Sequence, residues 1–385
     1  MTATQLNTHF ETRGIEFVLK TQQDQIANLQ KMQAHLQKYS LWDCVDHHSS
    51  QINDAYYNHF SLKQSYQNQW APNWDTTRLY ASMSIDGRQN KDDLDKEILV
   101  AMLLATIPFT FPSYEELLSA IHIRHYVVDA GYRAALNFDT EAAERPVDYW
   151  HYDEEAGFLL NKGKSIIDAL VKATQPDDIH QAYSFSCYRA TEYVILLSIA
   201  KELKNANPAL LKRLEERSEN RAIRSGEFHE VFLKEYGSIE NPFPMKYYVP
   251  GDRVWFRNPD DRSSDISGYE GSWVIYVGGG LFSNFWKRDQ PFTLVDKCVE
   301  IYHWRDGLRT RENGECWIDE SIVEDCVKAT HQQPEKLKRV LEVMMRIRDG
   351  KGIYAEGGCL DATRECPKQI ALSACELKLP DIKPH

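Results

Sequence analysis

The chain has 385 residues, 42% of them hydrophobic, which is enough for a sizeable core and excludes an intrinsically disordered protein. Its formal net charge is −12, and no five like charges follow one another, so a broad nucleic-acid-binding surface is excluded. The longest apolar runs, residues 98–109 and 193–200, are shorter than the ~18–20 residues that cross a bilayer, so we expect no membrane span.

The N-terminus lacks the charged-then-apolar pattern of a signal peptide, so a cytoplasmic protein is expected, exported only if a dedicated secretion system recognises it. The eight cysteines are too sparse for a disulfide scaffold, and no CxxC pair indicates a zinc ribbon. Free thiols are therefore expected. A disulfide within the tail is the alternative, because three cysteines lie close together there: Cys359, Cys366 and Cys375.

The first half of the sequence reads mainly as helices. Apolar spacing predicts a long amphipathic helix over residues 15–39, and weak periodicity predicts loops and short helices over the following polar and aromatic stretch. Further along we expect a buried helix at 95–107, a second helix from Pro112, a hairpin at 147–161, a short helix at 164–174 and a helix that begins at Cys187.

The pattern changes at Pro250. Residues 251–259 favour a strand, and residues 271–287 favour two strands joined by Gly278 to Gly280, a sequence typical of a turn rather than of a phosphate-binding loop. Residues 292–307 return to helix, and the last ~70 residues read as helical and then irregular. This order of elements predicts an α+β fold.

Cys187 stands where an apolar helix starts, in "YSFSCYRATEYVILLSIA". A helix N-terminus offers partial positive charge and unpaired N–H groups, and both stabilise a thiolate. The position is typical of a nucleophile, although an ordinary buried cysteine can also occupy it.

Two segments carry a family resemblance: "FSCYRATEYVILL" and "PGDRVWFRNPDDRSSDISGYEGSWVIYVGG". With "YWHYDEEAGFLL" and "KSIIDALV" upstream, they resemble the protein-glutamine γ-glutamyltransferases (transglutaminases) of spore-forming bacilli. The resemblance covers residues 112–307. It implies a papain-like domain over 111–307, in which the cysteine helix packs on an antiparallel sheet. The flanking segments are then an N-terminal helical extension (1–110) and a helical or irregular C-terminal extension (308–385).

The resemblance also implies a reaction. A cysteine thiolate, here Cys187, attacks a glutamine carboxamide, and a lysine amine or water then accepts the acyl group. The reaction needs no metal or organic cofactor. Its partners are a protein substrate carrying glutamine and an amine donor, with cross-linking or deamidation as the outcome.

The sequence departs from the family at the position of the base. The family has glutamates where Ser186 and Ser272 stand here, and its histidine on the second hairpin strand falls near Asn284 and Phe285. A serine cannot take a proton at neutral pH. Cys187 is thus retained, whereas the familiar bases are not.

Glu270 is the best remaining candidate for the base. If the strand already begins there, Glu270 and Ser272 point to the same face, so Glu270 could approach Cys187. Ser272 and Asn284 would then support it as neighbouring polar groups. The alternative is a solvated carboxylate at the end of a loop.

Several aromatic residues flank the same region. Tyr269, Trp255 and Trp273 match the wall of the apolar channel that leads to the thiol in the family, with ordinary core packing as the alternative. Asp252 and Arg253 also fit the family pattern, and we expect a turn cap and a surface ion pair from them.

Two histidine-containing stretches are weaker candidates. Residues 43–48 offer a cysteine, two aspartates and two histidines, but no second pair follows at zinc spacing, so no metal site is predicted. His122 and His125 share a helix face, and we expect no acidic partner nearby, which indicates surface or packing roles.

Two other functions fit the same residues. One is a papain-like cysteine amidase or peptidase acting on peptide or cell-wall amides, and the other is a non-catalytic binding module that kept the fold. The long terminal segments further suggest a toxin effector delivered into another cell, with a delivery or immunity protein as partner.

Overall fold

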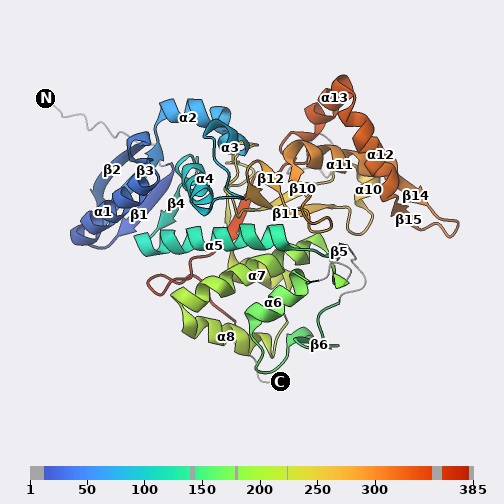
Figure 1. Cartoon of the computed structure of the whole chain (residues 1–385), viewed down its shortest axis with the longest axis horizontal. Helices are drawn as coiled ribbons and strands as arrows, with labels where there is room; N and C mark the ends of the chain where they lie inside the picture. Colours follow the sequence, from blue (N-terminus) through green and yellow to red (C-terminus); the bar gives the residue numbers. More distant parts are fainter. Residues whose placement is uncertain (1–12, 139–143, 178–180, 223, 349–357, 381–385) are drawn as a thin grey trace.

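A computed structural model describes residues 13–138, 144–177, 181–222, 224–348 and 358–380. It contains two larger sheets, one formed near the N-terminus and one in the second half of the chain, with long helices packed against them (Figure 1). The predicted α+β class is confirmed, and so is the packing of the cysteine helix on an antiparallel sheet.

The N-terminal sheet has the strand order β2-β3-β1-β4. Its strands are β1 (Ile15–Leu19), β2 (Val45–Ile52), β3 (Ala55–Leu62) and β4 (Phe109–Phe111). Helix α1 (Gln22–Lys38) starts at the N-cap Thr21 and contacts this sheet. The structure thus differs from the expected helix at 15–39 and from the loops expected after it.

One reason is how little of β2 faces the core. In β2 only Val45 is buried and the remaining side chains are partly or fully exposed, so the strand has almost no apolar alternation to detect. At the start, "IEFVL" is a β-branched and aromatic run, which favours a strand. Its last residue, Leu19, continues the apolar spacing of α1 toward the N-terminus. The spacing alone therefore predicted a helix that began too early.

Two long helices, α5 (Tyr114–Arg133) and α7 (Cys187–Ala206), pack side by side through the middle of the molecule (Figure 1). Both contact strand β11. The helices around them include α4 (Lys91–Leu103), α6 (Ile166–Thr174) and α8 (Pro208–Ser218).

The second sheet has six strands in the order β13-β12-β11-β10-β16-β9, and every neighbouring pair is antiparallel. The strands are β9 (Leu233–Tyr236), β10 (Arg253–Arg257), β11 (Gly271–Gly278), β12 (Leu281–Phe282), β13 (Phe292–Thr293) and β16 (Arg364–Pro367).

The two faces of β11 meet different helices. Val274 and Tyr276 belong to a core cluster with helix α11 (Leu294–Gly307), whereas Ile275 and Val277 face α5. Because side chains alternate along a strand, Ser272 shares the α11 face and Trp273 the opposite one. This alternation determines which predicted site residues can meet.

The remaining elements lie around these layers. They are α2 (Gln64–Trp70), α3 (Leu79–Ser82), α9 (Ser225–Phe232), α10 (Asp261–Ser264), α12 (Glu320–His331), α13 (Pro334–Met344), and the paired strands β5 (Asn137–Phe138) with β8 (Ser184–Phe185), β6 (Trp150–Asp153) with β7 (Gly157–Leu160), and β14 (Leu308–Thr310) with β15 (Cys316–Ile318).

The core crosses the predicted domain boundaries. One hydrophobic cluster includes both Ile15 and Leu379, and β16 lies inside the six-stranded sheet although it follows residue 307. The core of the described residues therefore continues across residues 110 and 307. The division of the chain at these two positions stays a prediction.

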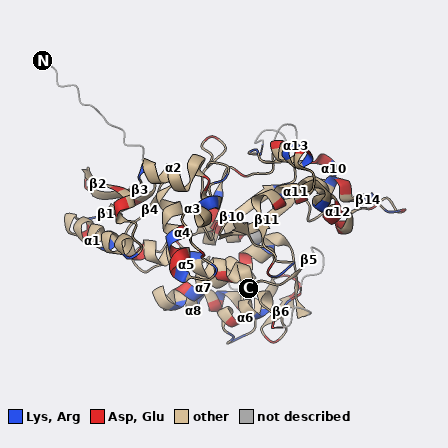
Figure 2. Ribbon diagram, turned by 45° about the horizontal axis from the view of Figure 1, so that its top comes forward, with Lys and Arg blue, Asp and Glu red and all other residues tan. Residues whose placement is uncertain are grey.

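None of the described helices combines the length and apolarity needed to cross a membrane. Both basic and acidic residues occur along α5 and along α12 and α13, as Figure 2 shows.

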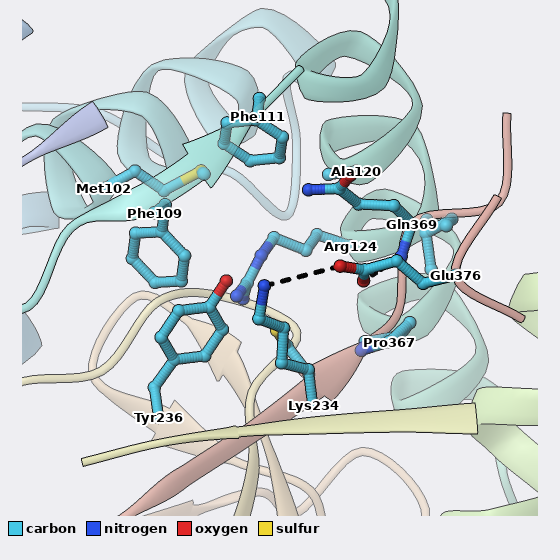
Figure 3. A pocket seen from close by; sticks show the side chains of 12 residues that line it. Met102, Phe109, Phe111, Ala120, Arg124, Lys234, Tyr236, Pro367, Gln369 and Glu376 are labelled. Carbon is cyan, nitrogen blue, oxygen red and sulfur yellow. Dashed lines mark hydrogen bonds and ion pairs between the residues drawn. The ribbon is translucent and has the colours of Figure 1, made fainter. Parts of the chain in front are cut away.

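Arg124 of α5 anchors the loop before β10. Its Nη1 donates to the Asp252 carboxylate at 2.8 Å and to the Pro250 carbonyl at 2.9 Å, and Asp252 also accepts the Val249 N–H at 2.8 Å. Asp252 thus caps the turn, as predicted. Beside Arg124 lies a cavity of ≈ 20 Å³, about the room of one water molecule, next to the Lys234–Glu376 ion pair (Figure 3).

Candidate active site

Cys187 is the first residue of α7, as predicted from the sequence. Ser186 is the N-cap, and its hydroxyl accepts the Arg189 N–H at 3.3 Å. The family glutamate position before the cysteine therefore serves here to start the helix, a role that serine fills well.

The sulfur of Cys187 faces the edge of β11. In the β10–β11 ladder, Tyr276 donates its N–H to Asp252, and by alternation the N–H of Trp273 points away from β10. Strand β12 pairs with β11 only at Tyr276 and Gly278, so the ladder with β12 does not reach Trp273. The Trp273 N–H instead contacts the Cys187 sulfur.

Several groups act on the thiol together. Burial has the largest effect and raises the pKa of Cys187 above its ordinary value. The N–H of Trp273, the ammonium of Lys297 and the N–H of Tyr188 lower this pKa, while the charge of Glu270 raises it. Cys187 itself keeps partial solvent exposure. The result is a thiol whose anion has three stabilising partners, although burial still favours the neutral form.

Glu270 lies at the entrance to β11, with its side chain exposed. Its carboxylate accepts the N–H of Gly268 at 3.0 Å. It is close enough to act on Cys187 through its charge, but its hydrogen bond closes its own loop. This placement favours the alternative expected from the sequence, a carboxylate at the end of a loop.

Ser272 and Asn284 occupy separate surroundings. Ser272 is buried and lies opposite Phe256 in the β10–β11 register, on the face that packs against α11. Asn284 follows β12, donates from its amide to the Gln290 carbonyl at 2.9 Å and accepts the Trp286 and Lys287 N–H groups, both at 3.2 Å. The amide of Asn284 therefore shapes a loop.

Trp255 and Trp273 come together as predicted, with ring centroids 5.0 Å apart. A Cβ at Gly271 would lie only 2.4 Å from the Trp255 indole, which explains the glycine at the start of β11. The two indoles line a pocket of ≈ 230 Å³. The Trp273 ring also packs edge-on against the ring of Tyr188, with the ring centroids 5.4 Å apart. Tyr188 directly follows the candidate nucleophile.

The predicted surface ion pair of Arg253 is wrong, because the ion pair that Arg253 forms is buried. Its side chain is fully buried, with the guanidinium 4.0 Å from the Trp273 ring and 4.3 Å from the Tyr188 ring. It pairs with Glu365 of β16 at 2.8 Å. The arginine thus connects the cysteine helix to a strand that lies more than a hundred positions later in the chain.

Tyr269 belongs to a different aromatic group. Its ring lies 5.2 Å from Trp304 of α11 and 6.0 Å from Phe138 of β5, and its hydroxyl donates to Glu320 at 2.6 Å. Of the three residues predicted to line one wall, Trp255 and Trp273 therefore contact each other, and Tyr269 faces α11 and α12.

Lys297 was not singled out from the sequence, although a signal was present. It falls on the same helical stripe as Leu294, Cys298 and Ile301, and a lysine among apolar residues at that spacing must be buried. It is only 3% exposed, and its ammonium pairs with Glu300 at 2.8 Å.

The histidines have partners that sequence spacing did not reveal. His125 contacts Asp95, and His122 lies 3.4 Å from Glu202, so the expectation of no acidic partner was wrong: both carboxylates come from other helices. Asp43, Cys44, His47 and His48 form no metal-ligating group within the described part of the chain.

One group of metal-ligating type does occur there, formed by His303, Asp306 and Cys326. Both imidazole nitrogens of His303 already have partners, Asp306 at 2.5 Å and Thr330 at 2.7 Å. The bond to Thr330 fastens α11 to α12, whereas the bond to Asp306 lies within α11. All eight cysteines are free, and Cys298 and Cys359 are buried with their sulfurs 3.4 Å apart.

Known proteins resemble this chain both in sequence and in structure. The family model described as protein-glutamine gamma-glutamyltransferase matches residues 77–353, which is well over half of the chain. Among solved structures, a transglutaminase from Geobacillus stearothermophilus (without C-terminal extension) aligns at 18% identity and a TM-score of 0.38, over 56% of this chain and 98% of that one. No curated protein matches the chain.

Proposed function

Because this chain belongs to the protein-glutamine gamma-glutamyltransferase family, a family of acyltransferases, we propose that it transfers the γ-glutamyl group of protein glutamines through a thioester at Cys187. The observation that carries the proposal is the contact between the Cys187 sulfur and the Trp273 N–H, at the N-terminus of α7. A nucleophilic thiol needs stabilisation of its anion, and these groups supply it.

In the proposed reaction, the Cys187 thiolate attacks the carbonyl carbon of a glutamine side chain. The new S–C bond forms, the C–N bond breaks, and the leaving nitrogen takes up the proton that the thiol lost and departs as ammonia. An amine then attacks the thioester, loses a proton and gives an amide, while the S–C bond breaks and restores the thiolate. Water in place of the amine gives glutamate. Cross-linking and deamidation thus differ only in the acceptor.

Two aromatic groups are candidates to guide the two substrates. Trp273 and Tyr188 lie on one face of β11, and Tyr269 lies toward α11 with Phe138. Aromatic surroundings exclude water and so favour an amine over hydrolysis. We therefore propose cross-linking as the main reaction and deamidation as the reaction without amine.

The test is incorporation of a biotinylated primary amine into an unfolded, glutamine-containing protein such as casein, followed by mass spectrometry. Without amine, the same glutamines should gain roughly one mass unit by deamidation, because water is then the remaining acceptor. Cys187→Ser should abolish both products. Cys316→Ser, which removes an exposed thiol, is the matched control and should retain both.

Activity that survives in Cys187→Ser would overturn the proposal. So would cleavage of backbone or cell-wall amides with no change at glutamine side chains, which would indicate a hydrolase instead. Delivery of the enzyme into another cell, expected from the long terminal segments, stays a prediction that a secretion assay would test.

A further inference from the structure

Two cysteines outside the candidate active site lie in contact with each other. Cys298 belongs to α11 and Cys359 follows it by 61 positions, yet their sulfurs are 3.4 Å apart. Both side chains are fully buried. A disulfide bond is ~2.0 Å long, so the sulfurs need to approach by only about 1.4 Å to form one. The fold thus brings together two thiols that lie far apart in the sequence.

The surroundings of this thiol pair favour an uncharged group. Both cysteines belong to the apolar core cluster around α11. Burial raises the pKa of Cys359 well above its ordinary value, and the contact with Cys298 raises it further. Thiols that stay protonated are poor nucleophiles and poor metal ligands, so the pair is unsuited to either role. A disulfide has no charge and no hydrogen-bond donor, and it therefore suits an apolar core.

The backbone holds Cys359 in place from two elements. Its N–H donates to the Met344 carbonyl at the end of α13 at 2.9 Å, and its carbonyl accepts the N–H of Arg257 of β10 at 2.8 Å. The next residue, Leu360, forms a bridge with Phe256 of the same strand. The Cys359 sulfur also donates to the Met344 carbonyl, at 3.2 Å. Because this carbonyl keeps the Cys359 N–H, it stays paired when the thiol proton is lost.

The other two cysteines of the tail lie in different surroundings. Cys366 lines the cavity beside Arg124, and the Cys375 sulfur donates to the Leu377 carbonyl at 3.7 Å. The sequence offered a disulfide within the tail as the alternative to free thiols. The contact with α11 favours a partner for Cys359 from outside the tail.

We propose that Cys298 and Cys359 are joined by a disulfide bond when the chain folds in an oxidising medium. The reaction is thiol–disulfide exchange with an oxidant that itself contains a disulfide, such as oxidised glutathione. One cysteine thiolate attacks a sulfur of the oxidant, the S–S bond of the oxidant breaks, and one thiol leaves. The second cysteine attacks the mixed disulfide and releases the second thiol. The two cysteines thereby lose two electrons and two protons, and the oxidant gains them as two thiols.

The bond fixes the segment that leads into β16. It forms before the core closes, because both sulfurs are sealed in the folded chain. Strand β16 supplies Glu365, which pairs with Arg253 at 2.8 Å, beside the rings of Trp273 and Tyr188. A cross-link over 61 positions restricts the unfolded chain and so stabilises this attachment. The inference goes beyond the proposed function, because the bond forms whether or not the chain modifies glutamine.

The experiment compares the full chain from two expression hosts, one with a reducing and one with an oxidising cytoplasm. Free thiols are alkylated with iodoacetamide in urea, and the protein is digested without a reductant. In the oxidised protein, mass spectrometry should find the Cys298 and Cys359 peptides joined, at roughly two mass units below their sum. In the reduced protein, both peptides should be alkylated separately. The oxidised protein should also unfold at a urea concentration about 1 M higher.

Variants assign both results to this pair of thiols. Cys298→Ala and Cys359→Ala should each abolish the joined peptides and the difference in urea midpoint. Cys316→Ser is the matched control, because it removes an exposed thiol and should leave both results unchanged. If an alanine variant does not fold, the peptide map of the wild-type protein decides by itself.

Separate alkylation of Cys298 and Cys359 in the oxidised protein would overturn the inference, and so would a Cys359 peptide joined to Cys366 or Cys375. A joined pair that leaves the urea midpoint unchanged would also contradict it, because the bond would then not stabilise the segment. These measurements involve neither glutamine nor Cys187, so their failure is distinct from a failure of the proposed function.

Discussion

Glu97 of α4 accepts the backbone N–H of Gly279 with both carboxylate oxygens, at 2.9 and 3.1 Å. Gly278, Gly279 and Gly280 all have positive φ, and the turn that they form joins β11 to β12. Tyr276 also donates its hydroxyl to Glu97, at 3.3 Å. A buried acid thus fastens the hairpin that carries Trp273 to a helix of the first half of the chain.

This acid should make stability depend on pH. Burial raises the pKa of Glu97 to about 7, from an ordinary value of 4.5. Between these values the folded protein binds the proton more tightly than the unfolded chain does, so the free energy of unfolding falls as pH rises. The fall begins near pH 4.5 and is complete slightly above pH 7, and it amounts to about 3 kcal/mol.

Glu97→Gln isolates this contribution, because the amide cannot ionise. Urea unfolding at pH 5, 6, 7 and 8 should show the variant gaining stability relative to the wild type with each step up to pH 7. If the free energies of unfolding of the two proteins differed by the same amount at every pH in this range, the pKa of Glu97 would not be raised.

Cys187 should react slowly at neutral pH. Burial raises the pKa of its thiol, so the thiolate fraction is small at pH 7 and grows towards alkaline pH. In the folded wild type, we expect iodoacetamide to modify exposed Cys316 faster than Cys187 at pH 7, and acyl transfer to increase up to pH 9. In 8 M urea the two cysteines should react alike. Faster modification of Cys187 in the folded protein would instead indicate a preformed thiolate.

Glu270→Gln should make the Cys187 thiol more reactive. Loss of a general base would instead make it less reactive. The negative charge of Glu270 raises the pKa of the thiol, so its removal should increase the alkylation rate of Cys187 at pH 8. Amine incorporation should change less than about tenfold, whereas loss of a general base costs ~10²–10⁴-fold. A decrease of that size in turnover would identify Glu270 as the base after all.

Arg253→Met should destabilise the protein strongly. It removes the buried partner of Glu365, which keeps the half-exposed His229 at 2.9 Å, and it removes the hydrogen bond from Nε to Thr191 at 2.9 Å and the guanidinium between Tyr188 and Trp273. Breaking a buried ion pair on one side costs about 3–5 kcal/mol. The matched control is Arg311→Met, since Arg311 and Glu315 form an exposed pair that contributes at most about 1 kcal/mol. The free energies of unfolding of both variants, measured in urea, test these two values.

The sequence predicted those parts of the site that depend on local signals. Ser186 before an apolar run specifies a helix N-terminus at Cys187, and the glycines after Val277 specify the hairpin turn. The order of helices and strands was therefore enough for the fold class and for the nucleophile candidate.

Contacts between distant segments could not be predicted in this way. The polarity of Lys297 is visible in the sequence, but its burial depends on α11 packing against β11, and the burial of Arg253 depends on Glu365. The N-terminal sheet was missed for a related reason: β2 keeps most side chains in solvent, so its pairing with β3 leaves little apolar pattern.

The position of β16 has a consequence for how the protein is made. This strand pairs with β9 through four residue pairs and with β10 at Arg253 and Glu365, so it closes the gap between them. Both neighbours leave the ribosome long before residues 364–367 do. Until then the nascent chain carries two open strand edges, which are templates for pairing with other chains. The growing polypeptide should therefore depend on chaperones while α10 to α13 are synthesised, and its sheet is completed only once β16 has emerged.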